Sequence, residues 1–226
     1  MSINIAIDGP AGAGKSTIAK KLAKELSFIY VDTGAMYRAM ALFCIRRSID
    51  IENDQAVSKL CQEADIKIEY KNGVQCILLN GENVNELIRT EEVSNITSKI
   101  SAYPKVREKL MALQQKLAED NDVIMDGRDI GTFVLPNAQV KIYLTASVQA
   151  RAKRRYDELQ KKGESVELDQ IEADMKERDY RDMHRETAPL TQAKDAVLID
   201  SSDMGIKDVV TEILVLLKKK GFVKKV

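Results

Sequence analysis

The sequence predicts an α/β fold in which a parallel five-stranded sheet carries helices on both faces. Five short apolar runs alternate along the chain with stretches in which apolar residues recur every three or four positions. Strands separated by helices need crossover connections, and such connections build parallel sheets that helices cover. A glycine-rich motif directly after the first run supports the same fold, because that motif joins a strand to a helix.

The five strand candidates are short and mostly apolar, as buried strands of a parallel sheet are. They span residues 3–7, 28–31, 123–125, 140–144 and 196–199.

A smaller feature interrupts this alternation. Residues 66–70, 76–79 and 82–84 are further strand candidates, and the pairs Asn72-Gly73 and Asn80-Gly81 separate them. Both residues of an Asn-Gly pair tolerate positive φ, which makes the pair a strong signal for a two-residue hairpin turn. Residues 65–84 are therefore predicted to form a small antiparallel insert.

Composition excludes several classes of protein. The chain has 226 residues, 44% of them hydrophobic, and at this length roughly 70% of the unfolded surface can be buried without metal or disulfide staples. The 35 Lys and Arg balance the 35 Asp and Glu, which argues against a general nucleic-acid coat. A single histidine cannot form a multi-histidine metal site. No apolar run approaches the ~18 residues of a membrane span.

The cysteines and the N-terminal residues indicate the cellular compartment in which the protein works. Cys44, Cys61 and Cys76 are odd in number and have no C-x-x-C spacing, and no signal-peptide pattern opens the chain. We therefore expect reduced, buried thiols in a cytoplasmic protein. The basic tail from Lys218 to Lys225 is expected to be the solvated end of a helix.

The residues after the first strand match the pattern G-x-x-x-x-G-K-[ST] in full. The matching residues are Gly9, Pro10, Ala11, Gly12, Ala13, Gly14, Lys15 and Ser16, followed by Thr17. Glycines let backbone N–H groups converge on a polyanion, and the helix that follows adds its positive end. The motif assigns Lys15 to the β- and γ-phosphates and the Ser16 hydroxyl to Mg²⁺. The chain has no N-K-x-D or D-x-x-G, which disfavours a GTPase of the Ras type.

Arginines that could grip phosphate oxygens form two groups in the sequence. The first lies on a helix face that is apolar for two turns and then ionic: Leu168, Ile171, Met175, Arg178, Asp182 and Arg185. This pattern fits a helix that ends in a polar cleft and equally a surface helix with an i,i+4 ion pair.

The second group is Arg151, Arg154 and Arg155, on the preceding helix. A polar loop at residues 161–165 joins the two helices, so the pair would suit a lid that closes over a transferred phosphate. A solvated helix or an RNA-binding patch is the alternative.

Two polar clusters follow the second and third strands. Residues 32–38 read Asp-Thr-Gly-Ala-Met-Tyr-Arg, and residues 126–129 read Asp-Gly-Arg-Asp. Ligands of open parallel sheets bind beyond the carboxyl ends of the strands, so both clusters should lie at the same edge as the phosphate loop. Turn chemistry is the alternative for each cluster taken alone.

Together these motifs resemble the bacterial cytidylate kinases, which are P-loop nucleoside-monophosphate kinases. The resemblance covers nearly the whole chain and rests on residues 7–10, 32–38, 103–107, 126–132 and 177–182. It implies one kinase domain over residues 1–226, with a core at 1–64, 85–150 and 187–226, the insert at 65–84 and a helical lid at 151–186. It implies that ATP, with Mg²⁺, phosphorylates CMP and dCMP.

The resemblance also implies roles for individual residues. The acceptor site would comprise Thr33, Arg38, Ser98, Arg107, Arg128, Asp129, Arg178, Asp182 and Arg185. Within it, Arg38 and Arg128 would hold the monophosphate and ribose side, while Ser98, Arg107 and Asp129 would read the cytosine and sugar. Asp182 would contact the sugar and the lid arginines the phosphates.

Further roles concern the donor side. Lys15, Arg128, Arg178 and Arg185 are the catalytic candidates, Arg154 would bind ATP, and Asp126 would act through water beside the Mg²⁺ ligand Ser16. Thr33 stands where many members have serine, and His184 is expected to have no chemical role. We expect a monomer without nucleic-acid or membrane partners. The alternatives are a kinase for UMP or for a hydroxyl-bearing metabolite, and an RNA-dependent ATPase or regulator.

Overall fold

The central sheet of the protein is parallel and five-stranded. The computed structural model describes residues 2–71 and 74–222. The strands β1 (Asn4–Asp8), β2 (Ile29–Asp32), β6 (Val123–Gly127), β7 (Val140–Thr145) and β8 (Val197–Asp200) pair in the order β2-β6-β1-β7-β8. The predicted fold is confirmed, and each predicted strand is present with its ends shifted by at most two residues.

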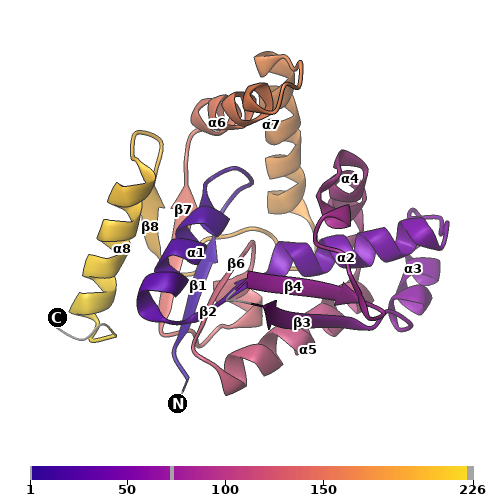
Figure 1. Cartoon of the computed structure of the whole chain (residues 1–226), viewed down its shortest axis with the longest axis horizontal. Coiled ribbons are helices and arrows are strands. Elements are labelled where there is room, and N and C mark those ends of the chain that lie inside the picture. The colour runs from indigo at the N-terminus through magenta and orange to yellow at the C-terminus, as the bar shows by residue number, and fades with distance from the viewer. Residues whose placement is uncertain (1, 72–73, 223–226) are drawn as a thin grey trace.

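Helices cover both faces of this sheet (Figure 1). The helices of the described residues are α1 (Lys15–Leu26), α2 (Thr33–Arg46), α3 (Asp54–Cys61), η1 (Leu87–Arg89), α4 (Glu91–Ile100), α5 (Pro104–Asp120), η2 (Ile130–Val134), α6 (Val148–Lys161), α7 (Leu168–His184) and α8 (Ile206–Lys219). Ile5 and Ile7 of β1 pack with α1 and α8 on one face. Ala6, between them, packs with Ala118 of α5 on the other face. Because both faces are covered, the three residues in the middle of β1 are all apolar.

The insert is a separate antiparallel sheet of β3 (Ile66–Lys71), β4 (Val74–Leu79) and β5 (Glu82–Asn83). Its apolar face packs on α2 within a second core that also contains α3, α4 and α5. Asn80 and Gly81 have φ values of 50° and 85°, so the predicted Asn80-Gly81 hairpin turn is confirmed. The predicted Asn72-Gly73 turn lies outside the described residues.

Helices α6 and α7 pack against each other and stand above the carboxyl ends of the strands (Figure 1). The Ser147 hydroxyl oxygen caps α6 by accepting a hydrogen bond from the Ala150 N–H at 3.2 Å. The connection between the helices contains the predicted polar loop. His184 is exposed at the end of α7, where its ring stacks on Tyr180.

The expectation that the cysteines are buried is confirmed. Cys44, Cys61 and Cys76 are all buried and free. No helix in residues 2–71 and 74–222 combines the length and the apolar content that crossing a membrane requires. The basic tail is described as far as residue 222, and its last residues lie outside the described part.

The Asn80-Gly81 turn gives a test of the insert. We predict that Gly81→Ala lowers the free energy of unfolding by about 1 kcal/mol, because an L side chain is strained at this positive φ. Gly81→Asn should cost less, since asparagine visits the left-handed region more readily. Urea unfolding of both variants measures the difference; equal losses would contradict the conformational explanation.

Candidate active site

The phosphate loop joins the end of β1 to the start of α1 at the carboxyl edge of the sheet. Gly12 and Gly14 adopt φ values of 76° and 91°, a region that residues with side chains rarely enter. Gly9 lies against β7, where a Cβ would come within 1.9 Å of the Leu144 carbonyl oxygen. With the N-terminus of α1 at Lys15, the loop forms a cradle for an anion.

Lys15 is the cation of this cradle and is only 6% exposed. Its Nζ donates a hydrogen bond to the Pro10 carbonyl oxygen at 2.8 Å, so the side chain folds back over the loop. Burial, followed by repulsion from Arg128, lowers the pKa of Lys15, although neighbouring carboxylates oppose that shift. A bound phosphate would favour the charged amine again.

The carboxylate of Asp126, at the end of β6, faces the start of α1. Its Oδ2 accepts a hydrogen bond from the Ser16 hydroxyl at 2.8 Å, and its Oδ1 accepts one from the Tyr30 hydroxyl at 2.8 Å. Burial and the nearby carboxylate of Asp32 raise the pKa of Asp126, against the opposing effects of Lys15 and of the two hydroxyl donors. The site is therefore built to hold this carboxylate in one orientation.

Ser16 and Asp126 fit the donor set that Mg²⁺ uses. Both present hard oxygen atoms, which lie side by side at the phosphate cradle. Mg²⁺ in phosphoryl-transfer sites takes one or two protein oxygens and completes its shell with substrate phosphates and water. No cluster of three or more His, Cys, Asp or Glu that could hold a metal occurs among the described residues.

Three arginines and one carboxylate gather under the lid. Arg128 donates from Nε to Asp182 Oδ2 of α7 at 2.7 Å. Burial, with repulsion from Arg128 and Arg38, lowers the pKa of Arg178 to about 10. The Nε of Arg178 is buried and has no hydrogen-bond partner among the described residues. One aspartate does not balance these cations, so the cluster is suited to an anionic ligand.

A second charged group surrounds Asp129, on the turn after β6. Arg107 of α5 forms a buried ion pair with Asp129, and Arg185 lies 3.3 Å from its other oxygen. The Thr33 hydroxyl donates to the Asp126 carbonyl oxygen at 2.7 Å, which ties the start of α2 to β6.

Ser98 lies on α4, next to the turn that carries Ser101. Its hydroxyl oxygen is buried and has no partner among the described residues. Ser101 donates to the Ser98 carbonyl oxygen, and the Ser101 carbonyl oxygen in turn accepts from Arg107. Ser98 is therefore linked to the Asp129 group and keeps a free hydroxyl.

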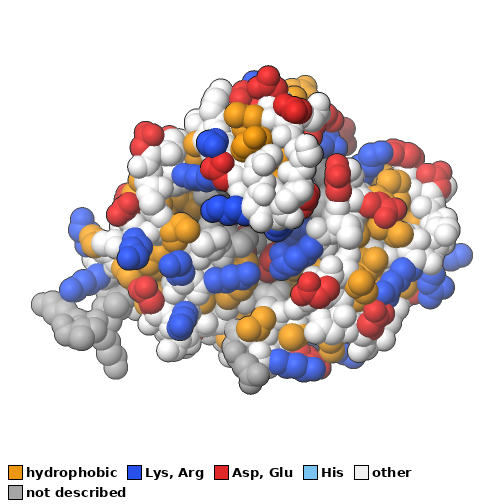
Figure 2. Space-filling model, turned by 45° about the horizontal axis from the view of Figure 1, so that its top comes forward, with side chains coloured by type: hydrophobic (Ala, Val, Ile, Leu, Met, Phe, Trp, Pro, Cys, Tyr) orange, Lys and Arg blue, Asp and Glu red, His pale blue; other side chains and the backbone are white. Residues whose placement is uncertain are grey.

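These groups meet in one cleft beneath the lid. In the sheet register Asp32 lies opposite Asp126, and Asp8 lies opposite Gly127. The prediction that both strand-end clusters share the edge of the phosphate loop is thus confirmed. Asp182 and Arg178 turn inward from α7, so that helix ends in a polar cleft. Figure 2 shows Lys and Arg side chains gathered around the hollow beneath the lid.

Comparison with known proteins identifies the family. The family model described as cytidylate kinase matches residues 5–219. The chain belongs to the cytidylate kinase family. Among its relatives, the cytidylate kinase of Enterococcus faecalis is 47% identical over 97% of each chain. The cytidylate kinase of Caldicellulosiruptor bescii is 50% identical over 96% of each chain.

Solved structures support the fold alone, because their sequences are distant. An uncharacterized protein from Eubacterium ventriosum is 13% identical, with a TM-score of 0.52, and the match covers 97% of this chain and 99% of that one. Shikimate kinase from Bacteroides thetaiotaomicron is 15% identical, with a TM-score of 0.50 over 96% of this chain and 98% of that one. The fold of this chain is therefore also found in a P-loop kinase of a different family, shikimate kinase.

Sequence reasoning assigned no role to Asp8, which the structure places beneath the site. Its two carboxylate oxygens accept hydrogen bonds from the N–H groups of Ile130 and Gly131 at 2.8 and 2.7 Å. Burial raises the pKa of Asp8 to about 6, although those N–H groups favour the anion. The wide turn η2 directly after Asp129 is thereby anchored to β1. No pattern in the sequence indicates these two hydrogen bonds, because they join residues more than 120 positions apart.

The three arginines that α6 carries have different partners. Arg151 is buried, forms a double hydrogen bond with Asp179 of α7, and donates to the Ala11 carbonyl oxygen at 2.9 Å. It therefore fastens the lid helices to the phosphate loop. Arg154 reaches Ser201 in the turn after β8. Arg155 is exposed, and its ion-pair partner among the described residues is Glu158 of its own helix, so it stays outside the cleft.

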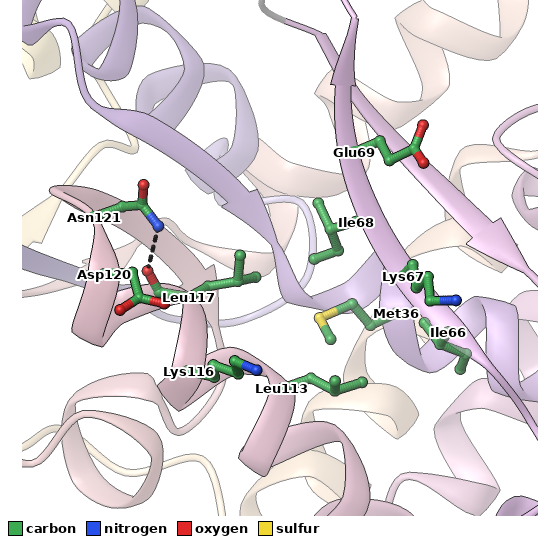
Figure 3. Close-up of a pocket in the computed structure, with 10 residues that line it drawn as sticks. All are labelled: Met36, Ile66, Lys67, Ile68, Glu69, Leu113, Lys116, Leu117, Asp120 and Asn121. Atoms are coloured by element: carbon green, nitrogen blue, oxygen red, sulfur yellow. Dashed lines mark hydrogen bonds between the residues drawn. The ribbon is translucent and has the colours of Figure 1, made fainter.

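A pocket elsewhere is not part of this site. A cavity of about 350 Å³ lies between β3 and the second half of α5, with Met36, Ile68 and Leu117 among its lining residues (Figure 3). None of the residues around the phosphate loop lines it.

The buried pair of Arg128 and Asp182 makes stability depend on pH. Burial alone would raise the pKa of Asp182, but Arg128 holds it below its ordinary value. A carboxyl group with a lowered pKa stabilises the fold above its unfolded pKa of about 3.9 and loses that contribution as the pH falls further. We predict that Asp182→Asn lowers the free energy of unfolding by about 3 kcal/mol at pH 7, because a buried arginine loses its counter-charge.

The difference between wild type and Asp182→Asn should shrink as the pH falls below about 4, because the Asp182 carboxyl then gains a proton first in the unfolded wild type and at still lower pH in the folded protein. Denaturant unfolding between pH 3 and pH 7 measures it. Asp157→Asn is the control, because Asp157 forms an exposed pair with Lys153 and should change stability little. A constant difference at every pH would rule out the ion pair as the cause.

Proposed function

We propose that this protein transfers the γ-phosphoryl group of ATP to CMP and dCMP. The observation that carries the proposal is the meeting of two anion sites in one cleft. The phosphate loop with Lys15 supplies the donor side. The arginines around Arg178, whose Nε is buried without a partner among the described residues, supply a site for the acceptor phosphate. The printed names of the relatives point to cytidylate as that acceptor.

In this reaction the protein itself forms no covalent bond with either substrate. An oxygen of the acceptor phosphate attacks the γ-phosphorus, and the bond from that phosphorus to the β–γ bridging oxygen breaks, so that ADP leaves with the electron pair. The acceptor oxygen is already anionic, so no general base is needed. Catalysis then rests on holding the two phosphates in line and on neutralising the negative charge between them.

The charged side chains divide this work. Lys15 binds the β- and γ-phosphates, while Arg128, Arg178 and Arg185 neutralise the transferring group. Arg38 holds the acceptor phosphate. Because Arg128 and Arg185 are each held by an aspartate, they need little rearrangement when the substrates bind, which lowers the cost of charge stabilisation.

Base recognition falls to the group around Asp129. Ser98 offers a buried hydroxyl, while Arg107 and Asp129 offer a fixed donor and a fixed acceptor, an arrangement suited to the polar edge of cytosine. Asp182 reads the sugar, and Arg154, beside the turn at Ser201, contacts ATP. A buried polar site of this kind rejects ligands that leave its groups unpaired.

Mg²⁺ would be held by the Ser16 hydroxyl and, through water, by Asp126. When bound, the ion neutralises charge on the β- and γ-phosphates. We further propose that the enzyme works as a monomer in the cytoplasm.

An ADP-release assay with ATP and a panel of acceptors tests the function. We expect turnover with CMP and dCMP that far exceeds turnover with UMP, AMP or GMP. ATP hydrolysis that RNA stimulates and CMP does not would instead support an RNA-dependent ATPase.

Lys15→Ala is the first test of mechanism. We predict a loss of kcat of more than about a hundredfold, because one preorganised charge is removed from the transferring phosphate. Lys21→Ala, on the exposed side of α1, is the control and should keep normal turnover. Near wild-type kcat in Lys15→Ala would show that the cradle is not catalytic.

Arg178→Ala is the second test. We predict that kcat falls by about a hundredfold and that KM for ATP changes much less, because the arginine acts mainly on the transferring group. Arg181→Ala is the matched control, since Arg181 lies on the same helix but is exposed. A defect confined to KM for ATP would contradict this role.

A further inference from the structure

The insert is attached by side chains to the open edge of the parallel sheet. Strand β2 is an edge strand, and its Ile29 N–H donates inward to the Asp122 carbonyl oxygen at 2.9 Å. The backbone groups of Tyr30 and Asp32 therefore face outward, because successive residues of a strand point to opposite neighbours. An edge of this kind carries unpaired donors and acceptors unless something covers it.

Two side chains of the hairpin cover this edge. Tyr70 and Gln75 are direct cross-strand partners in β3 and β4, so they project from the same face. The Tyr70 hydroxyl donates to the Tyr30 carbonyl oxygen at 3.0 Å. Gln75 Oε1 accepts from the Asp32 N–H at 2.8 Å, and its Nε2 donates to the Asp32 carbonyl oxygen at 3.4 Å. The hairpin thus supplies the hydrogen bonds that a further strand would make.

Strand β2 is connected in turn to the carboxylate of Asp126, through the side chain of Tyr30. The Tyr30 hydroxyl donates to Asp126 Oδ1 at 2.8 Å, while Ser16 occupies Oδ2 at 2.8 Å. With Oδ1 fixed by Tyr30, the carboxylate cannot rotate away from Ser16 without leaving the phenol unpaired in a mostly buried place.

Other contacts of the hairpin do not reach this carboxylate. Towards α5 the hairpin borders the open pocket of about 350 Å³ (Figure 3), and towards α2 it packs through apolar residues. Among the described residues, the side-chain hydrogen bonds from β3 and β4 to the parallel sheet come from Tyr70 and Gln75.

We propose that Tyr30 is a positioning residue for the carboxylate of Asp126, and that the hairpin β3–β4 holds Tyr30 in place through Tyr70 and Gln75. The insert then acts on the ATP side of the reaction as well as packing against α2, the helix that carries Arg38. This inference rests on the proposed kinase function, and it concerns how Mg²⁺-bound ATP is held rather than which acceptor is used.

Calorimetric titration without CMP tests the proposal, with ATP alone and with ATP plus Mg²⁺ as ligands. Tyr30→Phe removes only the hydroxyl. It should reduce the Mg²⁺-dependent gain in ATP affinity about tenfold, the effect of losing one hydrogen bond to a charged group. The affinity for ATP without Mg²⁺, and for CMP alone, should change less than about twofold, since neither ligand depends on the orientation of Asp126.

Tyr70→Phe and Gln75→Ala test the role of the hairpin. Each substitution should reduce the Mg²⁺-dependent gain in ATP affinity by about threefold, as expected for the loss of a neutral hydrogen bond. The double variant of Tyr30→Phe and Tyr70→Phe should be no worse than Tyr30→Phe alone, because the two hydroxyls act along one path. If Tyr30→Phe folds poorly by circular dichroism, the two hairpin variants still decide the question.

Tyr103→Phe is the matched control. Its hydroxyl also donates to a backbone carbonyl oxygen, that of Ile51 at 2.6 Å, far along the chain from β2. It should leave the Mg²⁺-dependent gain unchanged. The proposal is overturned if the Tyr30 and hairpin variants keep the full gain, if CMP affinity falls as much as Mg²⁺–ATP affinity, or if the double variant is additive. An enzyme that binds Mg²⁺–ATP normally but does not phosphorylate CMP would refute the proposed function and leave this result standing.

Discussion

The arrangement of the site depends on the hydrogen bonds that converge on Asp126 at the end of β6. Its carboxylate receives the hydroxyls of Ser16 from α1 and Tyr30 from β2, and its carbonyl oxygen receives the hydroxyl of Thr33 from α2. Three consecutive segments, which lie 93 to 110 residues before Asp126 at these contacts, are thereby fixed relative to that residue. Parallel pairing makes this possible, because it brings the carboxyl ends of β1, β2 and β6 to the same level.

Charge balance explains why this crowded edge remains folded. Arg107 and Arg185 share Asp129, Arg128 has Asp182, and Arg151 has Asp179. Each pairing reduces the desolvation penalty of a buried guanidinium group. Among the described residues Arg178 has no carboxylate partner of its own, and burial, followed by repulsion from Arg128, lowers the pKa of its side chain. The fold therefore tolerates incompletely balanced cations at the place where substrate phosphates would supply the missing negative charge.

Local patterns in the sequence predicted those features of the fold that depend on neighbouring residues alone. The alternation of apolar runs predicted the strands, Asn80-Gly81 predicted its turn, and the glycines predicted the phosphate loop. The strand order β2-β6-β1-β7-β8 could not be predicted in this way, because it depends on contacts between segments about a hundred residues apart. Arg151, Arg154 and Arg155 looked alike in the sequence, and only the packing of α6 against α7 and the phosphate loop separates their roles.

The residues that sequence reasoning missed act on the backbone rather than on a ligand. Asp8 binds the N–H groups of the turn after Asp129, and Gln75 binds both backbone groups of Asp32. Such contacts carry no spacing signal, since their partners are peptide groups that every residue possesses. They are nevertheless what holds Arg128, Asp129 and Asp126 within small tolerances, and phosphoryl transfer by positioning and charge is sensitive to such displacements. An insert that replaces a missing edge strand by two side chains can therefore influence the reaction centre without contributing a residue to it.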